Sequence, residues 1–162
     1  MRRDATGTVA DVSDERATEY GDEELLSRYP DQPIDHGNRW RYVGWLEGTL
    51  LVNRCADCGR FHEPPSPICP TCWSAAVEPT EVSGRGAVHM AIFLHQGPPA
   101  DGVDYATPYP VVVVELDEQP GLRYAGTVVD AANGDISIGR RVELAWLERA
   151  GSPRPAFRLE DV

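Results

Sequence analysis

Lysine is absent from this chain of 162 residues, and all fifteen of its basic side chains are arginines. That absence excludes Schiff-base chemistry, a phosphate-binding loop built around lysine, and a lysine general base. The 26 acidic residues outnumber the arginines, and the formal net charge is −11. Because affinity for nucleic-acid backbones comes mainly from basic side chains, this balance argues against a nucleic-acid partner.

Long hydrophobic runs are also missing. No apolar stretch approaches the roughly 20 residues needed to cross a bilayer, and Arg2 and Arg3 are not followed by the apolar region of an export signal. We therefore expect a cytoplasmic protein with no membrane partner. A reducing compartment fits free thiols and metal binding better than it fits disulfides.

Cysteine is scarce but strictly patterned. The four cysteines form two C-x-x-C pairs that are separated by ten residues: Cys55, Cys58, Cys69 and Cys72. Two residues between thiols let both sulfurs of a pair turn toward one ion, and two pairs can close a tetrahedral shell with no open position. The alternatives are two disulfides or four ordinary thiols. The pattern predicts a structural zinc site that performs no chemistry of its own.

The chain divides into four parts by composition. We expect a disordered acidic tail over residues 1–20, a helical segment over 21–48, a zinc ribbon over 49–78 and an OB-fold domain over 79–162. The last part contains five short β-type segments, with a longer link between the third and the fourth, which is typical of an OB-type Greek-key barrel. The predicted fold class is therefore mainly β, with short N-terminal helices, a four-cysteine zinc ribbon and a five-stranded OB-fold barrel.

Aromatic residues concentrate in a helix expected over residues 38–47, and the loop 96–108 and its end contribute two tyrosines. Large rings are enriched at protein interfaces, so these side chains are candidates for contact with a partner. The candidates are Trp40, Tyr42, Trp45, Tyr105 and Tyr109. The alternative for the helical rings is that they pack on the rest of this chain.

No catalytic constellation is recognisable in the sequence. It contains no G-x-S-x-G nucleophile elbow, and no cysteine remains free once a metal takes all four. His89 and His95 share one face of an expected strand and point outward. On the opposite face of that strand, Met90, Ile92 and Leu94 are expected to point inward. We expect a binding or assembly module rather than an enzyme.

From about residue 40 onward the chain resembles the DUF35, or acyl-CoA-associated OB-fold, family. The stretches that carry the resemblance are 48–60, 67–72, 82–88, 109–117, 138–143 and 155–158. The order of three features is specific to this family. They are the ribbon, a strand that begins at Gly84-Arg85-Gly86, and a late turn at Ile138-Gly139. The resemblance implies a non-catalytic subunit that accompanies thiolase-superfamily enzymes, namely thiolases, acyltransferases and steroid side-chain aldolases, with its barrel beside the channel for the CoA thioester.

Two other functions remain open at this point. The chain would be an independent CoA or acyl-CoA binding protein if Arg85, Arg123 or Arg140 contacted phosphates. It would be a single-stranded nucleic-acid binder if its OB fold carried a basic groove with exposed aromatic rings. The net charge of −11 disfavours the second of these. Structural zinc is the expected cofactor under every one of these hypotheses.

Overall fold

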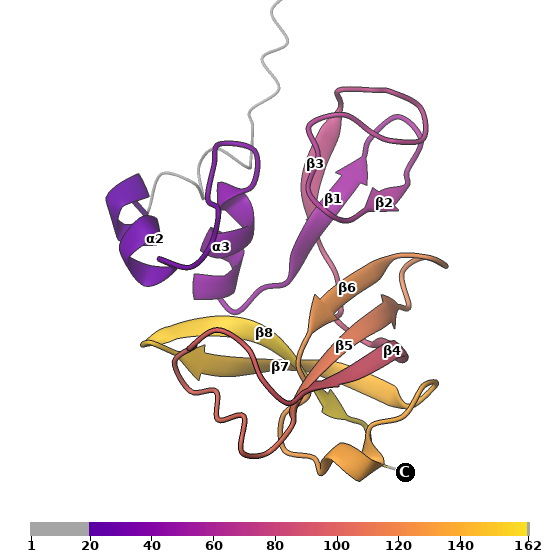
Figure 1. Cartoon of the computed structure of the whole chain (residues 1–162). Helices are drawn as coiled ribbons and strands as arrows, with labels where there is room; N and C mark the ends of the chain where they lie inside the picture. Colours follow the sequence, from indigo (N-terminus) through magenta and orange to yellow (C-terminus); the bar gives the residue numbers. More distant parts are fainter. Residues whose placement is uncertain (1–19, 162) are drawn as a thin grey trace, which may run out of the picture.

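The computed structural model describes residues 20–161 (Figure 1). The expected acidic tail therefore lies outside the described residues, except for its last position. The described chain contains two short helices, a three-stranded ribbon and a five-stranded antiparallel sheet that curls into a nearly closed barrel. The predicted fold class is confirmed. Within residues 20–161, no helix has the length and apolar character that a bilayer crossing requires.

The helices α2 (Asp22–Arg28) and α3 (Arg39–Leu46) precede the ribbon. The first turn of α2 consists of acidic residues, which favour the positive end of the helix dipole, and Pro30 prevents its continuation. After α3 the chain turns at Gly48, whose φ of +72° lies in the left-handed region that glycine adopts readily. Both helices agree with the helical segment expected from the sequence.

The ribbon has the strand order β2-β1-β3, formed by β1 (Leu51–Cys55), β2 (Phe61–His62) and β3 (Val77–Glu81). The sequence pattern does not predict β3, because its residues VEPTE include two glutamates and a proline and give a weak β signal. The strand forms because it pairs with β1 along its whole length. It also crosses the boundary between residues 78 and 79 at which the ribbon was expected to end.

The barrel has the strand order β6-β5-β4-β7-β8. Its strands are β4 (Gly86–Leu94), β5 (Tyr109–Leu116), β6 (Arg123–Gly126), β7 (Arg141–Arg149) and β8 (Ser152–Leu159), with the 3-10 turn η1 (Asn133–Asp135) between β6 and β7. Two backbone hydrogen bonds join β8 to the segment after β6. Phe157 donates its N–H to the carbonyl of Thr127 and accepts from Val129, both at 2.8 Å. These bonds bring together the two ends of the curled sheet.

A β-bulge in β4 reverses the expected orientation of its second half. The register with β5 shifts between Val88 and Met90, which leaves His89 as an extra residue. Beyond the bulge, Phe93 packs against the barrel core, whereas Met90 and Ile92 are 44% and 43% exposed. The predicted inward orientation of Met90 and Ile92 is therefore wrong, because one extra residue moves every later side chain to the other face.

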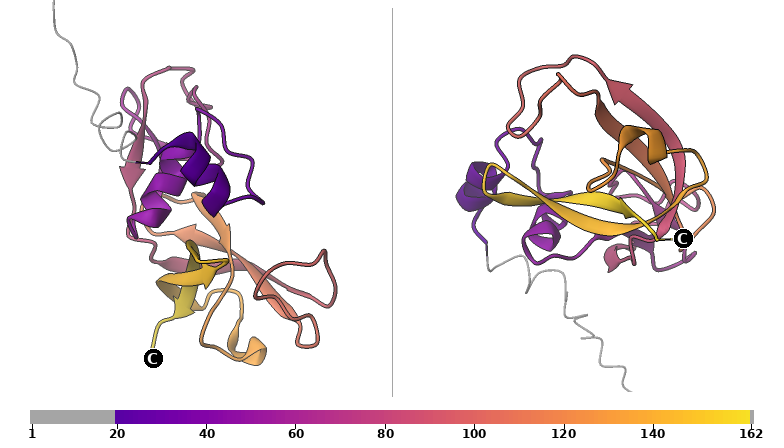
Figure 2. Two further views of the ribbon diagram at one scale, coloured as in Figure 1. Left: turned by 90° about the vertical axis from the view of Figure 1, so that its left-hand side faces the viewer. Right: turned by 90° about the horizontal axis from the view of Figure 1, so that it is seen from below.

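Buried apolar side chains form two clusters in the described residues. The barrel cluster consists of Leu50, Val52, Val82, Val88, Val112, Val114, Leu116, Leu122, Tyr124, Val128, Ile136, Val142 and Phe157. The smaller N-terminal cluster consists of Leu25, Tyr29, Tyr42, Val43 and Trp45, with Trp146 of β7 packed against it. The helices thus rest on the β7–β8 side of the barrel (Figure 2).

The ribbon is attached to the barrel by a side-chain clamp. The amide of Gln119, in the turn before β6, accepts a hydrogen bond from the N–H of Phe61 and donates one to its carbonyl, both at 3.0 Å. The Phe61 ring also packs against the barrel cluster, to which Val52 of β1 belongs. The ribbon therefore shares its apolar contacts with the barrel.

Candidate functional site

The four cysteine sulfurs lie within 4.8 Å of one another. Two Sγ–Sγ distances, Cys55–Cys72 and Cys58–Cys69, are 3.6 and 3.7 Å. A disulfide needs about 2.05 Å, whereas a tetrahedral zinc ion with Zn–S bonds of about 2.3 Å holds its sulfurs about 3.8 Å apart. The geometry fits a four-thiolate metal centre and not two disulfides.

The first cysteine pair lies in a tight turn that two backbone hydrogen bonds close. Gly59 donates its N–H to the carbonyl of Cys55 at 2.8 Å, and Cys55 donates to the carbonyl of Arg60 at 2.9 Å. Gly59 has a φ of +74°, as expected from the glycine at this position. We call this turn, residues 55–60, the first knuckle.

The second knuckle, residues 69–74, repeats this pattern. Trp73 donates its N–H to Cys69 at 3.0 Å, and Cys69 donates to Ser74 at 2.9 Å. Hydrogen bonds from the backbone N–H groups of Cys72 and Thr71 lower the pKa of the Cys69 thiol to about 6. This favours the thiolate of Cys69, which is the form that binds a metal, whereas hydrogen bonds with the neighbouring cysteine side chains raise the pKa of the Cys72 thiol to about 12.

The candidate metal site draws all four of its ligands from the protein, although one side of it faces solvent. Cys55 and Cys69 are buried, and Cys58 and Cys72 lie at the surface. Four protein thiolates would complete the tetrahedral shell of a bound metal, so neither water nor substrate would have a coordination position left. Such a centre joins the two knuckles and stabilises the ribbon.

The aromatic candidates of α3 contact the chain itself. Tyr42 and Trp45 are 3% and 7% exposed, and their ring centroids lie 5.4 and 5.5 Å from that of Tyr29. The expectation that these two rings contact a partner is corrected, because they fill the N-terminal cluster and have almost no free surface. Trp40 is half-buried, and its indole N–H donates to the carbonyl of Gly37 at 2.7 Å.

Tyr105 and Tyr109 flank the loop between β4 and β5 and are half-buried. The Tyr105 hydroxyl donates to the carbonyl of Pro98 at 3.2 Å, and the Tyr109 hydroxyl accepts from Arg149 at 2.8 Å. The guanidinium carbon of Arg149 also lies 5.9 Å from the centre of the Tyr109 ring. Contact of these rings with a partner stays a prediction.

The three arginines considered for phosphate binding lie at different places on the barrel. Arg85 precedes β4 and pairs with Glu160 at 2.9 Å, and Arg123 begins β6 and lies 3.6 Å from Glu115. Arg140 precedes β7, and its Nε atom is buried without a hydrogen-bond partner. A phosphate at Arg85 or Arg123 would compete with a carboxylate, so these contacts stay predictions.

Sequence reasoning missed Arg41, which touches all three parts of the molecule. Arg41 extends from α3, forms an ion pair with Glu63 after β2, and places its guanidinium carbon 5.3 Å from the ring centre of Tyr124 in the barrel. Burial raises the pKa of the Glu63 carboxyl above its ordinary value. An isolated arginine in a helix belongs to no motif, so only the fold could identify it.

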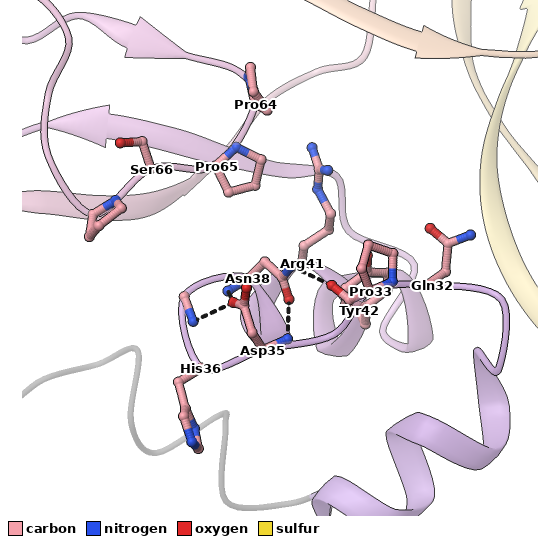
Figure 3. A pocket seen from close by; sticks show the side chains of 12 residues that line it. Gln32, Pro33, Asp35, His36, Asn38, Arg41, Tyr42, Pro64, Pro65 and Ser66 are labelled. Atoms are coloured by element: carbon pink, nitrogen blue, oxygen red, sulfur yellow. Dashed lines mark hydrogen bonds between the residues drawn. The ribbon is translucent and has the colours of Figure 1, made fainter.

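A cleft of about 640 Å³ lies between the turn 32–38 and the proline-rich segment 64–67, with Arg41 and Tyr42 among the residues that line it (Figure 3). The carboxylate of Asp35 does not face a free site, because it accepts hydrogen bonds from the backbone N–H groups of Gly37 and Asn38 at 2.8 and 3.0 Å. Arg41 is already paired with Glu63, so the cleft offers no unpaired charge from either side chain.

Comparisons with known proteins agree with this architecture. Residues 44–78 match the family described as the rubredoxin-like zinc ribbon domain of ChsH2, and residues 79–147 match the C-terminal OB-fold domain of ChsH2. A solved structure described as the Ltp2-ChsH2(DUF35) aldolase is 33% identical, with a TM-score of 0.70, and the similarity covers 79% of this chain and 98% of that chain.

Curated relatives extend the comparison. A DUF35 domain-containing scaffold protein of Methanocaldococcus jannaschii is 33% identical over 66% of this chain and 73% of its own length. A probable enoyl-CoA hydratase alpha subunit of Thermomonospora curvata is 34% identical over 82% of this chain, which spans only 40% of that relative. A DUF35 protein of unknown function from Sulfolobus solfataricus, 13% identical with a TM-score of 0.56, shares the fold.

Proposed function

Since the chain belongs to the DUF35 family, we propose that it is a non-catalytic subunit that binds and supports a thiolase-like enzyme acting on acyl-CoA thioesters. The observation that carries this proposal is the similarity to the Ltp2-ChsH2(DUF35) aldolase, which covers 98% of the matched chain. The similarity thus extends over nearly the whole of the matched chain. Relatives described as scaffold proteins support the same role.

The chemistry of the metal centre supports a structural role for this subunit. All four thiols point at one another, so none is available as a nucleophile once a metal is bound. We propose that the metal is zinc, because a four-thiolate tetrahedral shell is its usual structural site. Zinc supplies folding free energy here, and the residues of the two knuckles hold it.

We place the CoA thioester at the interface between the two subunits rather than in this chain alone. The reason is that Arg85 and Arg123 are paired with carboxylates on a chain of net charge −11. A polyanion such as CoA would be repelled by most of this surface. The enzyme subunit is therefore expected to provide most of the phosphate contacts.

Co-purification from a native lysate, followed by mass spectrometry and enzyme assays, tests the proposal. The tagged chain is expected to retain a thiolase-like subunit. It should raise the activity or thermal stability of that subunit and show no acyl-CoA turnover alone. Turnover by the chain alone that His95→Ala abolishes would overturn the proposal, as would recovery of nucleic acid with no enzyme. Tight CoA binding by the isolated chain would favour a stand-alone CoA-binding protein instead.

A further inference from the structure

The second knuckle lies in a stretch of the sequence that has no charged residue. Residues 64–77 contain neither acidic nor basic side chains, although charged residues make up 25% of the chain. Two apolar side chains in this stretch face solvent, Ile68 at 38% and Trp73 at 81% exposure. The centres of protein interfaces are depleted in charge and enriched in tryptophan. This composition is that of an interface core.

Trp73 is held in a conformation that its own side chain disfavours. Its φ of +62° lies in the left-handed region, which is an outlier for a bulky residue. The first knuckle has Gly59 at the corresponding position, with a φ of +74°. The turn therefore requires only a positive φ, for which glycine is better suited. Tryptophan adds strain at this position and exposes an indole to water.

No aromatic or cation–ring contact within residues 20–161 offsets the strain at Trp73. None of the ring–ring or cation–ring contacts among residues 20–161 involves Trp73. Strain that the rest of the structure maintains is typical of functional positions. The indole is therefore expected to serve a contact outside this chain.

The backbone around Trp73 is fixed from both knuckles. Its N–H donates to Cys69, and the hydroxyl of the following Ser74 donates to the carboxylate of Asp57 in the first knuckle at 2.5 Å. The knuckles follow the end of β1 that points away from the barrel (Figure 1), and Trp73 there is 81% exposed. A ring presented on a rigid turn loses little conformational entropy when it binds.

We propose that Trp73, assisted by Ile68, is the anchor with which the ribbon binds the enzyme subunit, its indole entering an apolar pocket there. The rim of that pocket is expected to be basic, because Asp57 lies beside Trp73 and the whole chain is acidic. This inference rests on the proposed function and adds to it the residue that makes the contact.

The test is the substitution Trp73→Gly, which removes the indole and gives the second knuckle the residue found in the first. The variant is expected to bind metal normally and to unfold no earlier than the wild type, because glycine relieves the strained φ. Its Kd for the purified thiolase-like subunit identified by co-purification is expected to rise by at least about 30-fold, the loss typical of a central tryptophan. Ile68→Ala is expected to cause a smaller rise.

Ile138→Ala is the matched control, since Ile138 is 75% exposed and lies on the barrel between η1 and β7 rather than in the ribbon. It should leave the Kd unchanged. Labelling the chain with 5-fluorotryptophan adds a direct readout. The ¹⁹F signal that is absent from Trp73→Gly should shift when the unlabelled enzyme subunit is added.

These measurements distinguish failure of the proposed function from failure of the role proposed for Trp73. If no thiolase-like subunit binds the wild type, the proposed function and this inference fall together. If the wild type binds and Trp73→Gly binds equally well with an unshifted ¹⁹F signal, only this inference is overturned. Loss of a homodimer in Trp73→Gly, with enzyme binding unaffected, would assign the indole to a second copy of the chain and would also overturn it.

Discussion

The barrel and the ribbon are both antiparallel sheets of the same chain, but different forces hold them together. The barrel encloses a continuous apolar cluster that includes Phe157 and Val114, both completely buried. The ribbon contributes Val52 and Phe61 to that same cluster, and its two knuckles have only the buried cysteines at their centre. The barrel is therefore stabilised by apolar burial, whereas the knuckles are expected to depend on a metal bound by the four cysteines.

The barrel and the knuckles differ in what their folding requires. This difference affects where the chain can expose a large apolar side chain. A metal-held turn can leave an apolar side chain such as Trp73 in solvent, because its folding does not depend on burying that side chain. The barrel is stabilised instead by burying most of its large apolar residues in one cluster. The most exposed tryptophan therefore occurs in the ribbon and not in the barrel.

Removal of the metal is expected to have the largest effect on stability. It should unfold the knuckles while the barrel stays folded. Structural zinc contributes on the order of 10 kcal/mol in small modules, more than the shared apolar contacts of the ribbon can replace. A chelator should abolish hydrogen-exchange protection in residues 55–76 before it affects β5 or β7. Elemental analysis should first find about one zinc per chain. Knuckles that remain protected without metal would contradict the comparison.

The reverse experiment weakens the barrel by substituting Phe157. This side chain is fully buried and packs edge-on against Tyr124, with the ring centroids 6.4 Å apart. Phe157→Ala should lower the free energy of unfolding by about 3–5 kcal/mol, because it leaves a large cavity. Denaturant titration with simultaneous metal-release measurement shows whether the ribbon unfolds separately. Release of metal at the barrel midpoint in both wild type and variant would mean that the two regions unfold as one.

Arg41→Ala is expected to have an intermediate effect, because Arg41 connects the helices, the ribbon and the barrel. Its side chain and that of Glu63 are 15% and 12% exposed, so the substitution leaves a nearly buried carboxylate without its partner. The expected loss is about 3 kcal/mol, measured by urea unfolding at neutral pH. The double substitution Arg41→Met with Glu63→Leu should recover much of it, since no unpaired charge remains. A double variant no more stable than Arg41→Ala would show that the ion pair is not the cause.

The smallest expected effect concerns Tyr29, whose hydroxyl donates to the carbonyl of Pro153 in β8 at 2.9 Å. Burial raises the pKa of Tyr29 to about 12. The folded state therefore favours the neutral phenol, and this stabilisation is complete below about pH 10 and is lost as the pH rises toward 12. Tyr29→Phe should cost about 1 kcal/mol at pH 8 and should make the alkaline loss of stability shallower. An equally steep loss between pH 10 and 12 would assign it to other groups, such as Tyr124, whose pKa burial also raises to about 12.

Much of the architecture was predictable because its signals are local. The spacing of the cysteines predicted the closed thiolate cluster, and β-branched runs such as residues 109–117 predicted the strands of the barrel. Glycine at position 59 also suits the positive φ of the first knuckle. Each of these features depends on residues within one turn or one strand, so the chain itself contains the information.

Other features required the tertiary structure. The sequence determined the cysteine spacing of the candidate metal site, the order of the modules and the mainly β class. The packing of segments far apart in the chain decided three further features. These are the bulge at His89, the burial of Tyr42 and Trp45, and the exposure of Trp73, over which no other segment packs. The physical reason is that a side chain is buried only when another element packs over it. For Tyr42 and Trp45 that cover comes from Tyr29 of the preceding segment and Trp146 of the barrel, about 100 residues further along the chain.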